Sequence, residues 1–440
     1  MAVIKPFQGI RYNPQCVQDL SKVVSQPYDR VRYGLQDKYY DQSAYTIVKI
    51  IKGKQFEDDD EANNVYTRAR DYLHTWLDEG VMQVEDVPAL YVLYQTFTLP
   101  DGEQYTRKAF TTALEITTFD QGVVLPHERT LSGPKIDRLN LTRATETYFG
   151  HIFMLYPDQE NRVNAILDQA VKAIEPTVVR ELFESDVTQR FWVITDPKVI
   201  AQVQAEMAPK TSLIIADGHH RYETAINYRD EMRAKYPDAP ANAGFNYRMV
   251  TLVSMSDPGL VILPTHRLMH SYDAKTSKQV IEDAQAYFDV QPVTDRAALE
   301  AALAKATPQA PRIGFYDGDY TVFTLKSPAV MDKIAPDRDP AWRLLDVSIL
   351  HEVLIERVMG LSQESVERKE NIDYLRDVEM GYERVDNGEA NFLFVMNPTR
   401  MAEVRACTAA DVKMPQKSTD FYPKVISGMV ALRVSPDERL

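Results

Sequence analysis

Cysteine is scarce in this sequence of 440 residues: only Cys16 and Cys407 occur, and they stand near opposite ends. Two cysteines so far apart exclude a disulfide framework and the paired ligand spacings of a structural zinc site. The eight histidines likewise show no HExxH or comparable metal-binding spacing. Low cysteine content is typical of a reducing compartment, so we expect a cytoplasmic protein.

Long apolar runs and surplus positive charge are also missing. No stretch reaches the ~18 uninterrupted apolar residues of a membrane span, and the first residues, "MAVIKPFQGIRYNP", hold no run of signal-peptide length. The 50 Lys and Arg against 64 Asp and Glu give a formal net charge of −14. Binding to a phosphate backbone needs a basic field, so we expect no nucleic-acid partner, although a local basic pocket is compatible with this charge.

Several well-known active-site motifs do not occur. There is no Walker A loop, no GxGxxG after a strand and no GxSxG elbow. No segment of 20 to 50 residues repeats along the chain, which excludes a solenoid or propeller. Any nucleotide or phosphate site must therefore be built in another way.

What is present is a mixture of strand and helix patterns. Residues 89–116 and 312–326 each consist of two β-rich runs around a turn, which predicts two hairpins. Residues 44–53 have the composition of a strand. Residues 58–80 have helical spacing, and the acids at 58–61 are expected to favour the positive end of that helix.

The middle of the chain alternates strand and helix. Residues 211–217 are expected to form a strand, a helix is expected after Gly218, and residues 247–255 are expected to form another strand, which together suggest a βαβ-like unit. A composition shift near residue 271 predicts a core at 1–270 and a second α/β lobe at 271–440. We expect the segment 411–430 of that lobe to return to the functional site.

The segment "LIIADGHHRYETAI", residues 213–226, places an acid, a glycine and three potential cations where an apolar strand meets a helix. The first N–H groups of a helix are unsatisfied and partly positive, so this junction suits an anion. His220 and Arg221 add cationic donors. Asp217 can cap the helix, bind Mg²⁺, or do both. The alternative is that Asp217 only caps the helix and the histidines are exposed; the residues together favour a phosphate site.

The segment "PHERTLSGPKIDR" is a second candidate. Six ionisable groups occur within twelve residues: His127, Glu128, Arg129, Lys135, Asp137 and Arg138. Phosphoryl transfer needs cations for the spreading charge and a carboxylate to accept a hydroxyl proton, a role that suits Glu128. An exposed polar loop is an equally good interpretation of this segment.

Two further segments are weaker candidates. In "MPQKSTDFYPKVISG", Lys417, Ser418 and Thr419 have the composition of an anion site, but a turn before the last strand explains them as well. In "LPTHRL", His266 and Arg267 are best interpreted as a surface or structural pair.

These segments, in this order, resemble a widespread bacterial and archaeal family of uncharacterised function. The likeness extends from "PFQGIRYNP" through "SQPYD" to the C-terminal strand. That family is similar to the ParB/sulfiredoxin-like fold, so the resemblance implies an α+β protein with a mixed core elaborated by additional α/β lobes.

The resemblance also implies roles for particular residues. In sulfiredoxins a Gly-Cys-His-Arg turn binds ATP phosphates, and Gly218, His219, His220 and Arg221 occupy the similar turn. His219 stands where sulfiredoxin has its reactive cysteine, so sulfinic-acid repair should be absent. Free-serine kinases on the same fold pair a His-Glu motif with an Asp-Gly-His-x-Arg turn. His127-Glu128 looks like the former, with Glu128 as base; Asp217, in the turn, would help to hold Mg²⁺.

The function implied is that of a Mg²⁺-dependent kinase that phosphorylates a small molecule, with free L-serine, giving O-phosphoserine, as the expected acceptor and ATP, ADP or pyrophosphate as donor. The expected catalytic residues are Glu128, His127 and Asp217. The expected phosphate contacts are Gly218, His219, His220, Arg221, Lys135, Arg138, Lys417, Ser418 and Thr419.

Two alternatives are a ParB-like nucleotide-binding regulator or DNA-associated protein without turnover, and a nucleotide-binding scaffold. The regulator would need a helix-turn-helix and a basic face, and the sequence shows neither clearly.

Overall fold

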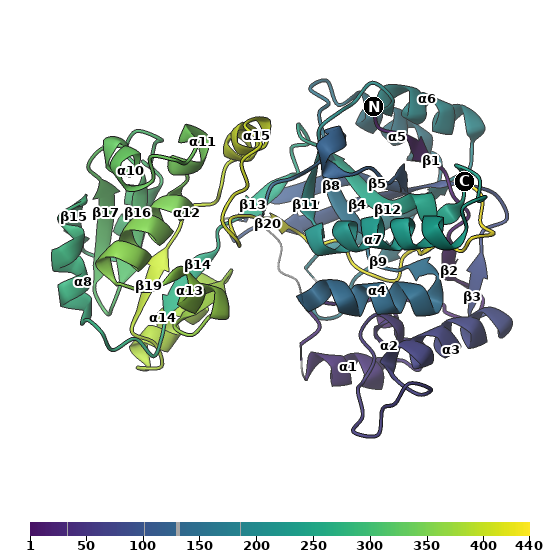
Figure 1. The fold of residues 1–440 in the computed structure, drawn as a ribbon, viewed down its shortest axis with the longest axis horizontal. Coiled ribbons are helices and arrows are strands. Elements are labelled where there is room, and N and C mark those ends of the chain that lie inside the picture. Colours follow the sequence, from purple (N-terminus) through teal and green to yellow (C-terminus); the bar gives the residue numbers. More distant parts are fainter. Residues whose placement is uncertain (33, 101, 129–132, 185) are drawn as a thin grey trace. The chain divides into compact units, whose positions relative to one another are not determined.

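Most strands of the described residues belong to one large mixed sheet or to one smaller antiparallel sheet, as a computed structural model shows (Figure 1); the others form the two-stranded pairs β2-β3, β7-β21 and β13-β20. The structure describes residues 1–32, 34–100, 102–128, 133–184 and 186–440. The described residues divide into two compact units. The first comprises Met1–Pro126, Thr130–Val261 and Pro423–Leu440, and the second comprises His127–Arg129 and Ile262–Tyr422. The division at residue 270 and the return of 411–430 to the functional site stay predictions.

The first unit is built around a sheet with the strand order β6-β11-β8-β12-β5-β4-β10-β9, and β1 pairs with β5 beside it. Its strands are β1 (Ile4–Lys5), β2 (Ile10–Tyr12), β3 (Met82–Val84), β4 (Leu90–Thr98), β5 (Gln104–Glu115), β6 (Val124–Pro126), β7 (Thr147–Tyr148), β8 (Ile152–Tyr156), β9 (Thr177–Val179), β10 (Thr188–Ile194), β11 (Leu213–Asp217), β12 (Tyr247–Ser254) and β21 (Leu432–Arg433); β13 (Val261–Leu263) begins at its boundary.

Helices lie on both sides of this sheet, with α5 and α6 above the strands and α7 and α4 below them in Figure 1. The helices of the unit are η1 (Leu20–Lys22), α1 (Leu35–Gln42), α2 (Val48–Ile51), α3 (Val65–Asp78), η2 (Phe119–Gln121), α4 (Gly133–Thr145), α5 (Arg162–Val171), α6 (Pro197–Met207), α7 (His219–Lys235) and η3 (Gly244–Asn246). One core joins the sheet to α5 and α6, and a second lies among α2, α3 and β2.

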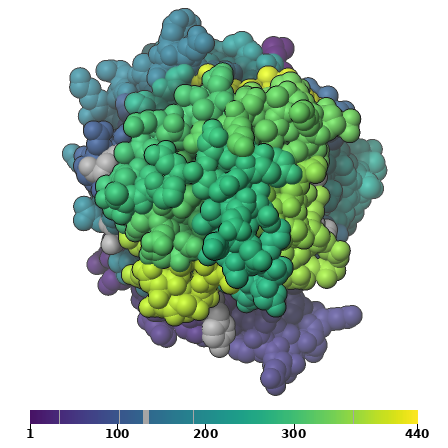
Figure 2. Space-filling view, turned by 90° about the vertical axis from the view of Figure 1, so that its left-hand side faces the viewer, coloured from purple at the N-terminus to yellow at the C-terminus, as the bar shows by residue number. Residues whose placement is uncertain are grey.

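The second unit has a sheet with the order β15-β17-β16-β19-β14-β18, in which every neighbouring pair is antiparallel. Its strands are β14 (His266–Met269), β15 (Phe288–Val293), β16 (Arg312–Tyr316), β17 (Tyr320–Leu325), β18 (Ile372–Leu375), β19 (Phe392–Val395) and β20 (Asp420–Tyr422). Its helices are α8 (Ser277–Ala284), α9 (Arg296–Leu303), α10 (Ala329–Ile334), α11 (Pro340–Arg343), α12 (Asp346–Ile349), the π-helix η4 (Leu350–Val358), α13 (Gln363–Arg368), α14 (Val378–Asp386) and α15 (Met401–Ala409). In Figure 2 the second unit faces the viewer. Its visible surface is mostly green, the colour of the middle of the range Ile262–Tyr422.

Both predicted hairpins are confirmed, because β4 pairs with β5 and β16 pairs with β17 in antiparallel register. The predicted strand at 44–53 is wrong: its apolar centre is the short helix α2, which is buried on three of its four residues. A continuous apolar run does not distinguish a buried helix from a buried strand, and in this protein the run forms a helix.

The predicted βαβ-like unit is also corrected. Strand β11 runs antiparallel to β8, whereas β12 runs parallel to β8, so β11 and β12 are antiparallel with β8 between them. A βαβ unit requires parallel strands. The elements of this stretch are the expected ones, but the observed fold is a mixed sheet.

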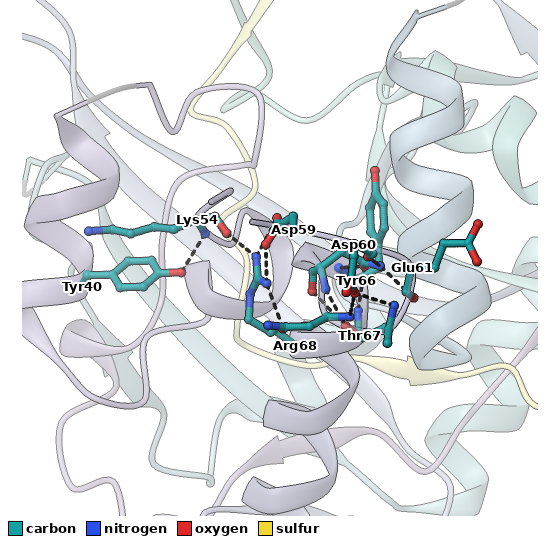
Figure 3. Close-up of polar contacts among 11 residues, drawn as sticks. Tyr40, Lys54, Asp59, Asp60, Glu61, Tyr66, Thr67 and Arg68 are labelled. Carbon is teal, nitrogen blue, oxygen red and sulfur yellow. Dashed lines mark hydrogen bonds and ion pairs between the residues drawn. The ribbon is translucent and has the colours of Figure 1, made fainter. Parts of the chain in front are cut away.

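The sequence suggested that the acids at 58–61 lie in the first turn of a helix, but in the structure they precede the helix. Helix α3 begins at Val65, its first turn holds no acid, and Asn64 caps it by accepting hydrogen bonds from the N–H groups of Tyr66 and Thr67. Figure 3 shows Arg68 of the helix reaching back to Asp59, and the two side chains form two hydrogen bonds of 2.7 and 3.0 Å. Arg68 therefore holds the acidic loop, and a separate residue, Asn64, caps the helix.

Replacing Asn64 with alanine tests this cap. We expect Asn64→Ala to lower the free energy of unfolding by ~1 kcal/mol, because two helix N–H groups lose their acceptor. Asp58→Ala, at an exposed acid of the same loop, should change it by less than ~0.5 kcal/mol. Urea unfolding measures both, and equal effects of the two variants would contradict the assignment of the cap to Asn64.

Candidate functional site

The turn between β11 and α7 lies at the end of a buried strand. Strand β11 pairs with β6 on one side and with β8 on the other, and its register against β8 shifts between Ile215 and Asp217. Such a bulge re-aims the next side chain, here Asp217. Gly218 then adopts φ +100°, a conformation that favours glycine, and α7 begins at His219. The first N–H groups of a helix of 17 residues therefore start directly after Asp217.

Asp217 does not cap this helix. The N-cap position is Gly218, and α7 has no side-chain capping bond. Instead, Asp217 Oδ2 accepts a hydrogen bond of 2.5 Å from Arg221 Nη2, and Lys424 Nζ lies 3.8 Å from Asp217 Oδ1. Of the two roles that the sequence left open, the capping role is wrong, and the Mg²⁺ role stays a prediction.

The guanidinium of Arg221 is held between two glycines. A Cβ atom at Gly218 would come within 3.1 Å of it, and one at Gly150 would come within 3.4 Å of Nη1. Arg221 Nη1 donates to the carbonyl of His151, and the residue is only 8% exposed. Burial acts to lower the pKa of Arg221, but the charge of Asp217, helped by Asp29, leaves that pKa raised. Arg221 thus contacts Asp217, and its predicted contact with phosphate stays a prediction.

The other predicted phosphate contacts of the first unit lie on α7 and on α4, which packs against it. His219 and His220 form the start of α7 and are half-buried. Lys135 forms an ion pair with Glu223 of α7. Arg138 forms an ion pair of 2.6 Å with Asp137 and stacks over the Tyr28 ring at 4.0 Å. Arg129 lies outside the described residues.

The second unit holds the other candidate cluster, made of His127, Glu128 and Thr419. His127 is fully buried, and its Nε2 lies 2.8 Å from Thr419 Oγ1. Thr419 donates from both its hydroxyl (3.1 Å) and its N–H (3.3 Å) to Glu128 Oε1. Because the Thr419 hydroxyl donates to Glu128, it accepts from His127, which places the ring proton on Nε2. The Glu128 side chain is 18% exposed, so a fixed carboxylate remains accessible.

The loop before Thr419 is supported by Arg267. Arg267 Nη2 donates to the carbonyl of Lys417 at 3.1 Å, and Lys417 has φ +58° with an exposed side chain. The Ser418 hydroxyl donates to the carbonyl of Pro415 at 2.6 Å, so it stabilises the turn. Arg267 is 2% exposed. His266 is also buried, and burial lowers its pKa to about 4. The His266-Arg267 pair is buried and so does not lie on the surface; its structural role stays a prediction.

Neither a metal cage nor a membrane span is visible in the part of the chain that the structure describes. No three His, Cys, Asp or Glu side chains gather there in an arrangement that could hold a metal ion. No helix within the described ranges is both long and apolar enough to cross a membrane.

The comparisons with known proteins place the chain in a family. The model of the family described as "Protein of unknown function (DUF1015)" matches residues 4–348. The chain belongs to this family. No curated protein matches this DUF1015 chain.

Three solved structures show a distant likeness to this DUF1015 chain. A conserved hypothetical protein from Pyrococcus furiosus aligns with a TM-score of 0.34 and 12% identity over 72% of this chain and 94% of its own. A free serine kinase in complex with AMP aligns with a TM-score of 0.34 and 11% identity over 72% and 90%. SbnI with a C-terminal truncation, from Staphylococcus aureus, aligns with a TM-score of 0.34 and 9% identity over 73% and 86%.

Sequence reasoning missed three residues around the turn of the DUF1015 chain, namely Tyr28, Arg248 and Lys424. Arg248 lies in β12, a strand whose eight residues are all buried. An arginine inside a strand with an apolar run, "MVTLV", was a signal that the sequence contained. Tyr28 and Lys424 stand far from the motif in sequence, and only the fold brings them close.

The space between Gly218 and Gly150 that holds the guanidinium of Arg221 is called here the Arg221 slot. A substitution at Gly218 tests how closely this slot fits. We expect Gly218→Ala to destabilise the protein by ~2–3 kcal/mol, because it adds backbone strain at φ +100° and a contact with Arg221. Gly122→Ala is the matched control, since Gly122 has φ +68° and nothing within 4 Å of an added Cβ; it should cost ~1 kcal/mol. If urea unfolding showed that both variants lose the same free energy of unfolding, the close fit of Arg221 in the slot would be contradicted.

The buried His151 predicts a pH dependence of stability. Burial, followed by the charges of Arg221 and Arg248, lowers its pKa to about 3. In the unfolded chain its pKa is about 6.5, so between these values the unfolded chain binds more protons. The free energy of unfolding should therefore fall as the pH falls from 6.5 towards 3, by up to ~1.4 kcal/mol per pH unit for this residue.

Urea unfolding at pH 5 and pH 7 measures this slope. We expect His151→Gln to reduce the difference between the two pH values, while His74→Gln, at an exposed histidine of α3, leaves it unchanged. An unaltered difference in His151→Gln would show that His151 is not the group involved.

Proposed function

We propose that this protein is a small-molecule kinase, which transfers a phosphoryl group from ATP, ADP or pyrophosphate to a hydroxyl group. Free L-serine, giving O-phosphoserine, is the acceptor that the sequence resemblance favours. In this proposal the mixed sheet with α4 and α7 is an elaborated ParB/sulfiredoxin-like core, and the enzyme works in the cytoplasm.

The observation that carries the proposal is the turn from β11 through Gly218 into α7. The N–H groups at the start of α7 have no side-chain cap at Gly218, and the helix dipole favours a negative group such as phosphate there. Lys424 and the half-buried His219 and His220 add potential donors close to the turn. Fixed donors of this kind stabilise the charge that develops on a transferring phosphoryl group, because they need no reorganisation during the reaction.

Glu128 is the proposed base. Two hydrogen bonds from Thr419 fix its Oε1, and the carboxylate, 18% exposed, has the chemistry to accept a proton from the acceptor hydroxyl. As that proton moves to Glu128, the acceptor oxygen forms a bond to the phosphorus atom and the bond from phosphorus to the donor's bridging oxygen breaks. The donor leaves with one phosphoryl group fewer, and the buried His127 keeps the Thr419 hydroxyl oriented.

Asp217 has the chemistry to hold Mg²⁺ only as a single protein carboxylate, with phosphate oxygens and water completing the shell, which is a common mode for this ion. When bound there, the ion would neutralise charge on the donor phosphates. In this proposal Arg221 positions Asp217, while Lys135, Arg138, Lys417 and Ser418 are secondary contacts for phosphate.

A second candidate is a nucleotide-binding regulator without turnover. The observation that favours it is the engagement of Arg221, whose two terminal nitrogens already bond to Asp217 and to the carbonyl of His151. An arginine held in this way binds a phosphate less readily than one that points into solvent. The regulator would bind a nucleotide and give no product.

The two candidates differ in a direct assay. We expect O-phosphoserine, detected by mass spectrometry, when the protein is incubated with L-serine, Mg²⁺ and one of ATP, ADP or pyrophosphate. Glu128→Gln should lower kcat by ~100-fold or more, because the proton acceptor is lost, while the affinity for the donor is unchanged.

Glu282→Gln is the matched control, since Glu282 is an exposed carboxylate on α8 of the same unit. Its kcat should equal that of the unaltered protein. A Glu128→Gln variant with full activity would remove Glu128 as the base, and nucleotide binding without product from any donor would favour the regulator.

A further inference from the structure

The first unit contains a cavity next to the Arg221 slot. About 40 Å³ of it is open to the centre of a water-sized sphere, which is room for a few water molecules or for one compact group. The described residues that line it come from α2, α4, β7, α7, β12 and three loop segments: Tyr28, Ile51, Arg138, Leu141, Thr142, Thr147, Tyr148, Phe149, Gly150, Arg221, Thr224, Arg248 and Ser427. None of these lining residues is acidic, and three are arginines.

Two of the three arginines already have a carboxylate partner. Arg138 pairs with Asp137 and Arg221 pairs with Asp217. Arg248 has no such partner among the described residues: its Nη2 donates to the carbonyl of Gly150 at 2.5 Å, and its buried Nε and Nη1 have no hydrogen-bond acceptor. The residue is only 3% exposed.

A buried guanidinium in this state requires an acceptor. Burial lowers the pKa of Arg248 to about 9; Tyr148 opposes this shift and the nearby Arg221 adds to it, so the side chain is charged at neutral pH. A buried charge without a partner costs several kcal/mol, and the stacking of Arg248 over the Tyr148 ring, at 3.8 Å, offsets only part of this cost. An anion in the cavity would supply the missing acceptor.

The wall beside Arg248 offers a neutral donor as well. The hydroxyl of Tyr148 is buried and has no hydrogen-bond partner among the described residues. Burial raises the pKa of Tyr148, so this hydroxyl keeps its proton and can donate it to an anion. Arg248 and Tyr148 thus both line the cavity and together carry three buried donor groups without a partner among the described residues: Nε, Nη1 and the phenol hydroxyl.

We infer that this cavity binds a compact oxyanion, a carboxylate or a phosphate group, with Arg248 as its main cationic contact and Tyr148 as a neutral donor. The planar guanidinium matches the paired oxygens of either group. The inference goes beyond the proposed function, because neither Arg248 nor Tyr148 takes part in the proposed transfer, and an oxyanion can bind here without turnover.

Titration calorimetry on the full chain tests the inference, with sodium phosphate and sodium acetate as separate probes at constant ionic strength in chloride. We expect saturable binding of at least one anion, and the one that binds more tightly names the group. Arg248→Lys should weaken binding by about tenfold or more, because lysine loses the paired donor geometry. Tyr148→Phe, which removes a single oxygen atom, should weaken it by about threefold to tenfold.

Arg143→Lys is the matched control, since Arg143 lies on α4 and its side chain is 47% exposed; binding should be unchanged. Absence of saturable binding by both probes would overturn the inference. So would binding that is equally tight in the original chain, in Arg248→Lys and in Tyr148→Phe, because the anion would then sit elsewhere. Binding that depends on Arg248 in a protein that makes no O-phosphoserine would support the inference and contradict only the proposed function.

Discussion

The hydrogen bonds of the buried Arg221 guanidinium hold together the part of the first unit where β11 ends and α7 begins. One terminal nitrogen bonds to Asp217 and the other to the carbonyl of His151, while Gly218 and Gly150 leave just enough space on the two sides. Removing Asp217, whose side chain is 26% exposed, would leave the buried guanidinium without its ionic partner, which is costly because a buried charge needs a counter-charge. The aim of Asp217 and the wall of the neighbouring cavity both depend on this one side chain.

Other buried arginines in this protein bind to backbone carbonyls in the same way. In the first unit Arg248 bonds to the carbonyl of Gly150 and Arg107 to that of Pro423, and in the second unit Arg267 bonds to the carbonyls of Thr265 and Lys417. A guanidinium has five donors in a rigid plane, so a single side chain can hold two or more chain segments at fixed spacing. The fold thus uses positive charge inside an acidic protein to position irregular segments.

The sequence predicted local features better than their partners. Alternating hydrophobicity around a turn identified both hairpins, because that pattern belongs to strands alone, whereas the apolar run at 44–53 suited a buried helix equally well. Sequence order likewise showed strand, turn and helix around Gly218. It could not show that β8 would lie between β11 and β12, because strand order depends on contacts between distant segments.

The candidate site shows the same difference between local motifs, which the sequence revealed, and the partners of their side chains, which it did not. The motif residues Asp217, Gly218 and Arg221 were recognisable, and so were His127 and Glu128. The bond of Arg221 to Asp217, the two bonds of Thr419 to Glu128, and the place of Arg248 in the cavity all required the fold. A turn of five residues leaves a pattern in a single sequence, but partners such as Thr419 and Glu128, 291 residues apart, do not, and the rotamers that join Arg221 to Asp217 four residues away are set by the packing around them.

The last segment of the chain, Pro423–Leu440, belongs to the first unit, although about 160 residues of the second unit precede it. Its strand β21 pairs with β7, and Ala431 and Ser427 form bridges to Ile10 and Ser25 near the other end of the chain. During synthesis on the ribosome the first unit therefore cannot close these pairings until the whole second unit has been made. Until then the N-terminal segments of the first unit lack these pairing partners, because the partners are not yet translated. This arrangement favours assistance by a chaperone for the nascent chain.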